Sequence, residues 1–288
     1  MAKRPASTAS DSPSDETDAG GADKGAAALR TGTLLRGLAI LDILIPAGHP
    51  LSLAEIAAEA DLDLSTALRL LRTLEEARQV IRVGDGKRYV ASPKALRPLP
   101  LLHPIEQLRR EVDPIIRDLA AKVSKTVVLV AYLGTERVVV EVMQSAGSLS
   151  PYYSTWLHGP LHASGPGKAL LLSMDATRRR ALLGAAPYAT FTASTITDAK
   201  ALEADLERAA KRGYVLVRNE YYEGLSAMAT NFQTFGGRAV GCIALTGHSA
   251  DFDEGSIDAM AAELMACARL MPLQAVSLKM LDQLAGRS

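Results

Sequence analysis

The chain has 288 residues, enough for two domains of ordinary size, and its 48% hydrophobic content allows each domain to bury a core. Its 32 Lys and Arg residues balance 32 Asp and Glu residues, which argues against a strongly basic protein. The sequence contains no run of about 18 apolar residues and no signal-peptide pattern. These features exclude a membrane-spanning class and predict a cytoplasmic protein without a membrane partner.

The two cysteines, Cys242 and Cys267, lie in apolar contexts and lack a CxxC spacing. We therefore expect reduced thiols in the core, and neither a disulfide framework nor a metal site. The segment before Lys168 resembles a phosphate-binding loop only superficially, because His162 stands at the first glycine position and Ala169 at the Ser/Thr position. No cofactor is expected.

The chain begins with a segment, residues 1–28, that is rich in Ala, Ser, Asp and Gly and lacks periodic apolar residues. This composition predicts a disordered tail. A first helix is predicted from Leu34 to Ile45, and Gly48-His49-Pro50 ends it. Four apolar side chains share one face of this helix: Leu34, Leu38, Leu41 and Ile45.

Residues 53–90 predict a short amphipathic helix, a tight break, a second amphipathic helix and two short β-rich runs. Asp61 and Asp63 mark the break, because short polar side chains cap helix starts. Asp85-Gly86 is a hairpin turn signal. The apolar face of the second helix has the i, i+3, i+4, i+7 spacing, at Ala67, Leu70, Leu71 and Leu74. This order of elements is the outline of a winged helix-turn-helix, whose second helix enters the DNA major groove.

The opposite face of the second helix carries Ser65, Arg69, Arg72 and Glu76. A short hydroxyl and two guanidinium groups suit base edges and phosphates, since Arg bonds bidentately to guanine or to phosphate oxygens. An ordinary solvated helix face is the alternative interpretation. The predicted hairpin and the preceding helix favour DNA.

The charge distribution gives only modest support to nucleic-acid binding. Residues 30–97 carry 10 Lys and Arg against 8 Asp and Glu, a net charge of +2. Specific binding by so weakly basic a module requires a dimer and good local contacts rather than bulk attraction.

Three prolines between residues 96 and 104 mark a domain boundary. A helix from Ile105 to Val123 follows. Beyond it the pattern predicts strands at 126–133, 137–142, 214–217, 226–232 and 239–246, and helices at 165–173, 199–212 and 257–271. Hairpins with separate helices indicate the α+β class, with an antiparallel sheet covered by helices.

Several segments in order resemble the IclR family of bacterial transcriptional regulators: LSLAEIA at 51–57, Ser65-Thr66 with Arg69-Leu70-Leu71, LHASGPGKALL at 161–171, TITD at 195–198 and Arg212-Gly213-Tyr214. The resemblance covers residues 33–272. It implies an α+β protein with an N-terminal winged helix-turn-helix, a linker helix and a C-terminal GAF-like antiparallel sheet with helices. The expected segments are a tail (1–28), a DNA-binding domain (29–97), a linker helix (98–123) and an effector-binding and oligomerisation domain (124–288).

The resemblance implies a double-stranded DNA operator as one partner. The residues expected to meet DNA are Ser65, Thr66, Arg69 and Arg72 on the recognition helix, Lys87 and Arg88 on the wing, and Arg36. Two departures stand out. The family usually has Pro-Lys before Ser-Thr, where this chain has Asp63-Leu64, and often His or Tyr in place of Leu68. These differences predict a changed operator preference or weaker binding.

A second partner implied by the family is a small-molecule effector. Gly165-Pro166-Gly167 precedes a helix, and the free N–H groups of a helix N-terminus can hold a carboxylate; a structural glycine turn is the alternative. The family's polar effector positions fall on Val217, Ala227, Ala244 and Thr246, of which three are apolar here. A hydrophilic keto acid would lack partners at these positions, so an apolar or aromatic acid or amide is expected.

Aromatic residues support the same interpretation. Leu149, Tyr152 and Trp156 lie just upstream of the signature and are expected to line the cavity, with Tyr221-Tyr222 as a second aromatic pair. Core packing or an oligomer interface is the alternative role for them.

The family implies a homodimer or tetramer, and repression is the expected sign of regulation. The sequence has no GxSxG elbow, no HExxH and no histidine cluster, so we expect no enzyme; a hydrolase is a remote alternative. The main alternative is a ligand-binding sensor or scaffold with weakened DNA binding. Effector binding would act on the two DNA-binding heads through the linker helix.

Overall fold

The computed structural model describes residues 21–95, 100–145, 157 and 159–285. The chain divides into two compact units, residues 1–98 and 99–288, close to the predicted boundary. Residues 1–20 of the predicted tail lie outside the described residues. No helix in the described ranges combines the length and the apolar character needed to span a bilayer.

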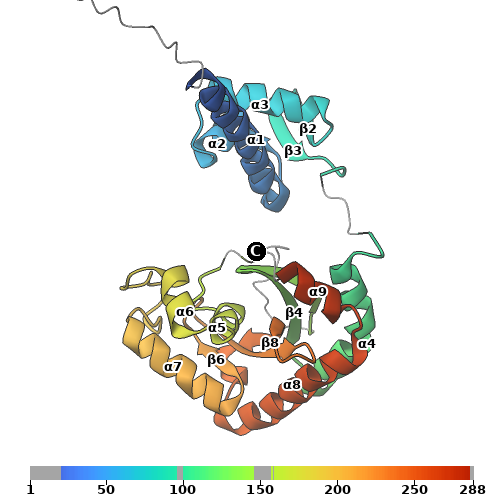
Figure 1. Ribbon diagram of the computed structural model, residues 1–288, viewed down its shortest axis with the longest axis vertical. Coiled ribbons are helices and arrows are strands. Elements are labelled where there is room, and N and C mark those ends of the chain that lie inside the picture. Colours follow the sequence, from blue (N-terminus) through green and yellow to red (C-terminus); the bar gives the residue numbers. More distant parts are fainter. Residues whose placement is uncertain (1–20, 96–99, 146–156, 158, 286–288) are drawn as a thin grey trace, which may run out of the picture. The chain divides into compact units, whose positions relative to one another are not determined.

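The N-terminal unit is a three-helix domain with a small antiparallel sheet in the order β1-β3-β2 (Figure 1). The elements are α1 (Gly21–Ala47), β1 (Leu51–Ser52), α2 (Leu53–Glu59), α3 (Leu64–Glu76), β2 (Val80–Val83) and β3 (Arg88–Ala91). The pair α2 and α3 is the helix-turn-helix, and β2 with β3 forms the wing. The predicted winged helix-turn-helix is confirmed.

The starts of both helices of the motif are fixed by side-chain caps. Ser52 and Glu55 form a reciprocal capping box at the start of α2. Asp63 caps α3 by accepting the Thr66 N–H at 2.9 Å. At the wing turn, Gly84 and Gly86 have φ of 67° and 78°, a conformation that favours glycine.

The structure corrects the interpretation of the first helix. It starts at Gly21, inside the segment predicted as a tail, where an Ala-rich stretch has high helix propensity. The predicted apolar face is largely exposed, with Leu34 at 66% and Leu38 at 46% exposure. The core of the unit contains Ile40 and Leu44 on a neighbouring face, and of the predicted face Leu41 packs against it.

The C-terminal unit is built on a five-stranded antiparallel sheet in the order β5-β4-β8-β7-β6. Its strands are β4 (Thr126–Leu133), β5 (Glu136–Met143), β6 (Val215–Arg218), β7 (Leu225–Gln233) and β8 (Ala239–His248). Its helices are α4 (Pro104–Val123), α5 (Gly165–Leu172), α6 (Ala176–Leu183), α7 (Ala199–Arg212), α8 (Glu254–Gln274) and α9 (Leu278–Ala285), with a 3-10 turn at Ser249–Asp251. The predicted antiparallel α+β domain is confirmed.

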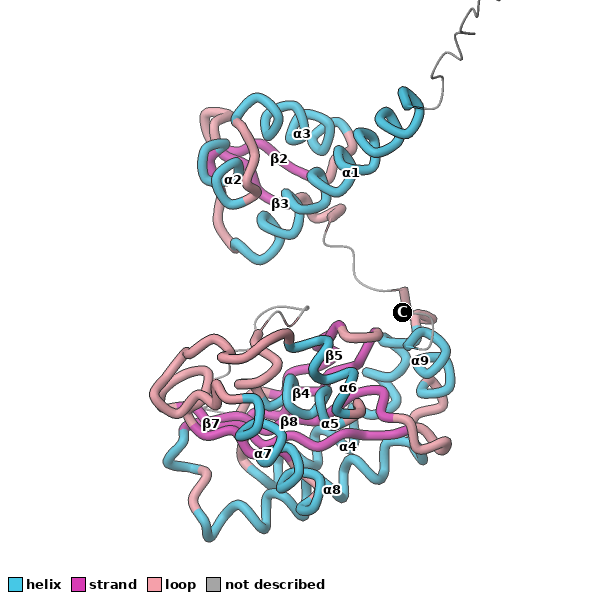
Figure 2. The backbone as a smooth tube through the Cα atoms, turned by 60° about the vertical axis from the view of Figure 1, so that its left-hand side comes forward, coloured by secondary structure: helices cyan, strands magenta, loops and turns pink. Residues whose placement is uncertain are grey.

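Helices cover both faces of this sheet (Figure 2). Strand alternation divides the side chains of β4: Val127 and Leu129 pack into a core with α4, α8 and α9, whereas Val128 and Val130 pack with α5 on the other face. The α5 face carries the pocket described below.

The predicted linker helix, α4, is an integral part of the C-terminal unit. Its apolar face, with Leu108, Val112 and Ile116, is buried against the sheet and α8. Arg109 adds an ion pair to Glu141 of β5 at 3.0 Å. The helix is therefore attached along its length to the domain that carries the pocket.

Candidate functional site

The outer face of α3 presents the side chains expected to meet DNA. Ser65, Arg69 and Arg72 are exposed, whereas Ala67, Leu70 and Leu71 on the inner face are buried. Within the described residues, neither guanidinium group has an ion-pair or hydrogen-bond partner. Both are thus available to phosphates or base edges without first breaking a contact.

The first turn of α3 is acidic and hydrogen-bonded. Asp63 Oδ1 accepts the Ser65 hydroxyl at 2.6 Å as well as the Thr66 N–H. These bonds hold the pKa of Asp63 well below its usual range, so its carboxylate is charged. Thr66 is half-buried whereas Ser65 is exposed, so Ser65 is the more accessible of the two side chains.

The cations of the wing already have neighbours on the protein. Lys87 Nζ lies 3.2 Å from Asp85, and Arg88 Nη1 donates to the Pro50 carbonyl at 3.0 Å and lies 3.8 Å from Glu55. These pairs are exposed and therefore weak, which leaves both cations free to exchange them for phosphates. Arg36 is exposed on α1.

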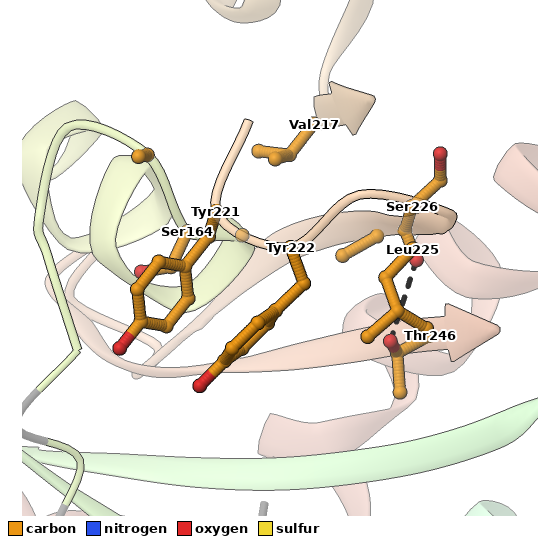
Figure 3. Close-up of a pocket in the computed structure, with 10 residues that line it drawn as sticks. Ser164, Val217, Tyr221, Tyr222, Leu225, Ser226 and Thr246 are labelled. Carbon is orange, nitrogen blue, oxygen red and sulfur yellow. Dashed lines mark hydrogen bonds between the residues drawn. The ribbon is translucent and has the colours of Figure 1, made fainter. Parts of the chain in front are cut away.

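A pocket opens on the α5 face of the C-terminal sheet (Figure 3). Its empty volume is about 310 Å³, which includes space open to solvent. The residues that line it are Ala163, Ser164, Gly165, Val217, Tyr221, Tyr222, Leu225, Ser226, Ala227 and Thr246.

Strand register explains why residues distant in sequence share the floor of the pocket. Val217 of β6 pairs with Ala227 of β7, which pairs with Thr246 of β8. Adjacent strands in register place these side chains in one row on one face. Gly165, at the start of α5, lies over the same row, because a Cβ on it would be 3.2 Å from that of Ala227. The structure thus brings four predicted effector residues together.

Other predicted residues do not line the pocket. Ala244 is fully buried on the same face of β8, and Pro166 and Gly167 are buried within α5. A Cβ on Gly167 would lie 2.6 Å from the Cα and the carbonyl oxygen of Leu161, so this glycine is required for close backbone packing. Leu149, Tyr152 and Trp156 lie outside the described residues.

The start of α5 offers fewer donors than its sequence predicts. Ser164 Oγ caps the helix by accepting the Gly167 N–H at 3.2 Å, and Pro166 has no N–H. Within the described residues, the Gly165 N–H has no hydrogen-bond acceptor. One backbone donor therefore remains at the pocket edge, which suits a single oxygen of a ligand.

Two tyrosines form one wall of the pocket. The ring centroids of Tyr221 and Tyr222 are 4.2 Å apart, and Phe191 packs edge-on against Tyr221 at 4.9 Å. The Tyr221 hydroxyl and partial burial raise the pKa of Tyr222 to about 12. The Tyr222 phenol donates its single proton to Tyr221, so the pair has one further hydroxyl proton, that of Tyr221, for a ligand.

The rest of the lining is mostly apolar. Val217, Leu225 and Ala227 supply only hydrocarbon, and the Thr246 hydroxyl donates to the Ser226 carbonyl at 3.3 Å (Figure 3). A ligand with many polar atoms would leave several of them unsatisfied here, at about 1–3 kcal/mol each. An apolar body with one polar end fits this lining better.

A buried ion cluster joins the elements around the pocket. Lys168 of α5 is fully buried and donates to Glu220 at 2.7 Å and to Asp205 of α7 at 2.8 Å. Glu220 immediately precedes the two wall tyrosines, and burial raises its pKa despite the ammonium group beside it. The cluster therefore fixes the tyrosine wall to the helix that forms the pocket edge.

Sequence reasoning missed several residues of this site. Ala163, Ser164, Leu225 and Ser226 line the pocket, and Lys168 and Glu220 brace it. The apolar surroundings of Lys168 in the sequence are the one signal that indicated a buried, partnered cation. The pairing with Glu220 depends on tertiary structure and has no sequence signature.

The fold and these surfaces define a class of protein: a transcriptional regulator with a DNA-binding helix-turn-helix unit and a separate α+β unit with a small-molecule pocket. The family model described as the IclR helix-turn-helix domain matches residues 33–84, and that described as bacterial transcriptional regulator IclR C-terminal matches residues 104–272. The chain belongs to the IclR family of bacterial transcriptional regulators.

One relative supports this assignment by sequence, and a solved structure shares the fold. The chain is 30% identical over 241 residues to the HTH-type transcriptional repressor AllR of Escherichia coli (strain K12), covering 81% of this chain and 84% of AllR. The IclR protein of Thermotoga maritima has a similar structure, with a TM-score of 0.61, 23% identity and coverage of 85% and 99% of the two chains.

A second solved structure of the same fold is an IclR homolog from Microbacterium hydrocarbonoxydans complexed with 4-hydroxybenzoate. It has a TM-score of 0.70 and 18% identity, and covers 86% of this chain and 99% of its own. At this identity the likeness shows the fold.

Proposed function

We propose that this chain is a repressor that binds an operator in the cytoplasm and is controlled by a ring-bearing or otherwise apolar acid or amide. The row formed by Val217, Ala227 and Thr246 beneath the tyrosine wall carries the proposal, because it combines an apolar floor with few polar groups. The relative AllR is named a repressor, which supports the sign of regulation.

Two groups support an effector with one polar end. The Gly165 N–H and the Tyr221 phenol are donors at the pocket margin, whereas the floor is mostly hydrocarbon. An aromatic ring between the floor and Tyr222 would bury apolar area and gain a stacking contact of about 0.5–1.5 kcal/mol. The fold relative that binds 4-hydroxybenzoate shows that a ligand of this class occurs with this fold.

A second copy of the chain is the proposed partner of α1. Its exposed leucines, Leu34, Leu35 and Leu38, form a contiguous apolar stretch with exposures of 46% to 66%. Exposed apolar patches on soluble domains often mark protein interfaces. Pairing of two chains through this helix would bring two copies of α3 to a two-fold operator. The pair could be the complete homodimer or one half of a tetramer.

Control of DNA binding requires that the effector has different affinity for the DNA-competent and incompetent arrangements. The proposed route starts at the pocket and passes through the sheet to α4. Arg109 ties α4 to β5, and Glu111 accepts a hydrogen bond from the Ser277 hydroxyl at 2.7 Å. These contacts would transmit a shift of the domain to the helix nearest the boundary at Pro98.

Fluorescence anisotropy with the DNA upstream of the protein's own gene tests the regulatory part. Binding tighter than to a scrambled duplex, and weakening between two salt concentrations, supports a sequence-specific regulator. Equal affinity for both duplexes, and for fragments upstream of neighbouring genes, would favour a sensor without an operator.

A thermal-shift panel tests the effector class. We expect stabilisation by benzoate-type acids and amides and none by glyoxylate or pyruvate. Val217→Asn should abolish the shift without placing a charge in this buried site, whereas Val217→Asp should also lower the melting temperature without ligand. Stabilisation by small keto acids alone would contradict the proposed pocket chemistry.

A further inference from the structure

The first turn of the recognition helix α3 has an unusual chemical character. It begins with a charged, exposed carboxylate on Asp63 and an exposed leucine, Leu64, at 55% exposure. The two arginines of the same face lie farther along the helix. Because the N-terminal residues of a recognition helix contact base edges, this turn faces bases rather than solvent in a DNA complex.

The hydrogen bonds of this turn leave only acceptors for DNA. Asp63 Oδ1 is used by Ser65 Oγ at 2.6 Å and by the Thr66 N–H at 2.9 Å. The Thr66 side chain and the Ser65 N–H also interact with this carboxylate, which remains an acceptor because its two oxygens offer about four lone pairs. Ser65 has committed its only hydroxyl proton to Asp63, so its oxygen offers lone pairs alone. Two acceptor groups thus stand side by side.

An acceptor-only surface discriminates among bases. A carboxylate is repelled by phosphates, by N7 and O6 of guanine and by O4 of thymine, because all of these groups are hydrogen-bond acceptors. Adenine has an amino group, but its neighbouring N7 is an acceptor that repels the second carboxylate oxygen. Cytosine presents its N4 amino group and carries no acceptor of its own in the major groove, and Asp and Glu are its matching side chains.

We propose that Asp63 is a specificity-determining residue that accepts a hydrogen bond from a cytosine N4 amino group, while Leu64 contacts a neighbouring thymine methyl group. The proposal rests on the sequence-specific DNA binding proposed above and names the bases that the first turn of α3 selects. An apolar side chain is the usual partner of the thymine methyl.

The test is selection of bound duplexes from a randomised library by the full-length protein and its variants. Wild type should enrich duplexes with a cytosine at one position. Replacement of that cytosine by another base should lower the affinity about 5- to 150-fold, which corresponds to the 1–3 kcal/mol of a good base contact. Asp63→Asn keeps a helix cap and should move the preference to adenine, which Asn recognises through N6 and N7. Asp63→Ser also keeps a cap and should lose the preference.

Glu76→Gln is the matched control, since it removes one negative charge from the same face of α3 at its far end. It should alter affinity for all sequences alike and leave the selected bases unchanged. Leu64→Ala should weaken only the preference for the neighbouring thymine. If wild type and both Asp63 variants select the same bases, this proposal is wrong while the operator model stands. If wild type enriches no sequence, both are wrong.

Discussion

Replacement of Lys168 by methionine tests whether the buried ion cluster holds the pocket together. Methionine approximates the length of the lysine stem and removes the ammonium group. The change leaves the carboxylates of Glu220 and Asp205 buried, with 6% and 8% exposure. Asp205 keeps an ion pair with Arg208 at 3.1 Å, whereas Glu220 loses its ion-pair partner and keeps a backbone hydrogen bond to Ile196.

Loss of one member of a buried ion pair costs about 3–5 kcal/mol, because an uncompensated charge remains in the core. We expect Lys168→Met to lower the free energy of unfolding of the C-terminal unit by this amount at pH 7. Lys122→Met is the matched control. Lys122 is 49% exposed and pairs with Asp118 and Glu263, and an exposed pair contributes about 0–1 kcal/mol.

The loss should shrink as the pH falls. Burial raises the pKa of Glu220 in the folded protein, and removal of the ammonium raises it further. A group with a higher pKa in the folded state binds its proton more tightly there, so its folded state loses stability as the pH rises through that pKa. Acidification toward pH 5 therefore neutralises Glu220 and restores part of the stability of Lys168→Met.

Urea denaturation followed by far-UV circular dichroism measures the free energy, and hydrogen exchange of residues 219–224 localises the effect. We expect faster exchange in this segment, which contains the tyrosine wall, and unchanged exchange in α3. A loss below 1 kcal/mol at pH 7, equal to that of Lys122→Met, would refute the structural role of the cluster.

Three further predictions concern the pocket and the DNA surface. Gly167→Ala should lower the free energy of unfolding of the domain by about 1–3 kcal/mol, because the added methyl would lie 2.6 Å from the backbone of Leu161. Gly165→Ala should cost less, because its methyl would lie 3.2 Å from the side-chain methyl of Ala227. Urea denaturation midpoints of the two variants test this order. Arg69→Ala should cost about 1–3 kcal/mol of operator affinity if it reads guanine, and anisotropy that shows an equal loss on every duplex would assign it to phosphate. Ala227→Asp should lower the affinity for an apolar effector, measured by calorimetry, and leave the affinity for DNA unchanged. An unchanged effector affinity would show that the effector binds at another site.

The strands and most helices could be predicted from the sequence because each has one dominant period. The run Thr126–Leu133 and the helix Ala199–Arg212 agree with the structure at both ends. The helix Ala176–Leu183 was not predicted, since it buries no residue and so has no apolar period. Helix Leu278–Ala285 was also missed, although Leu278 and Leu281 are buried.

The site was predictable only in part, because its floor depends on register between strands. Val217, Ala227 and Thr246 were placed by resemblance, and pairing across β6, β7 and β8 explains their proximity. The ion cluster joins residues 37 and 52 positions apart from Lys168, a contact that no local pattern encodes. In α1, apolar side chains occur on more than one face, so periodicity alone did not identify the buried one.

The central claim is that occupation of the apolar pocket controls DNA binding. Titration of 4-hydroxybenzoate and related ring-bearing acids into a preformed complex of the full-length protein with operator DNA, followed by anisotropy, tests it directly. We expect release of the DNA from wild type at ligand concentrations that leave the Ala227→Asp complex intact. Equal release from both proteins, or release by glyoxylate but by no ring-bearing acid, would contradict the account.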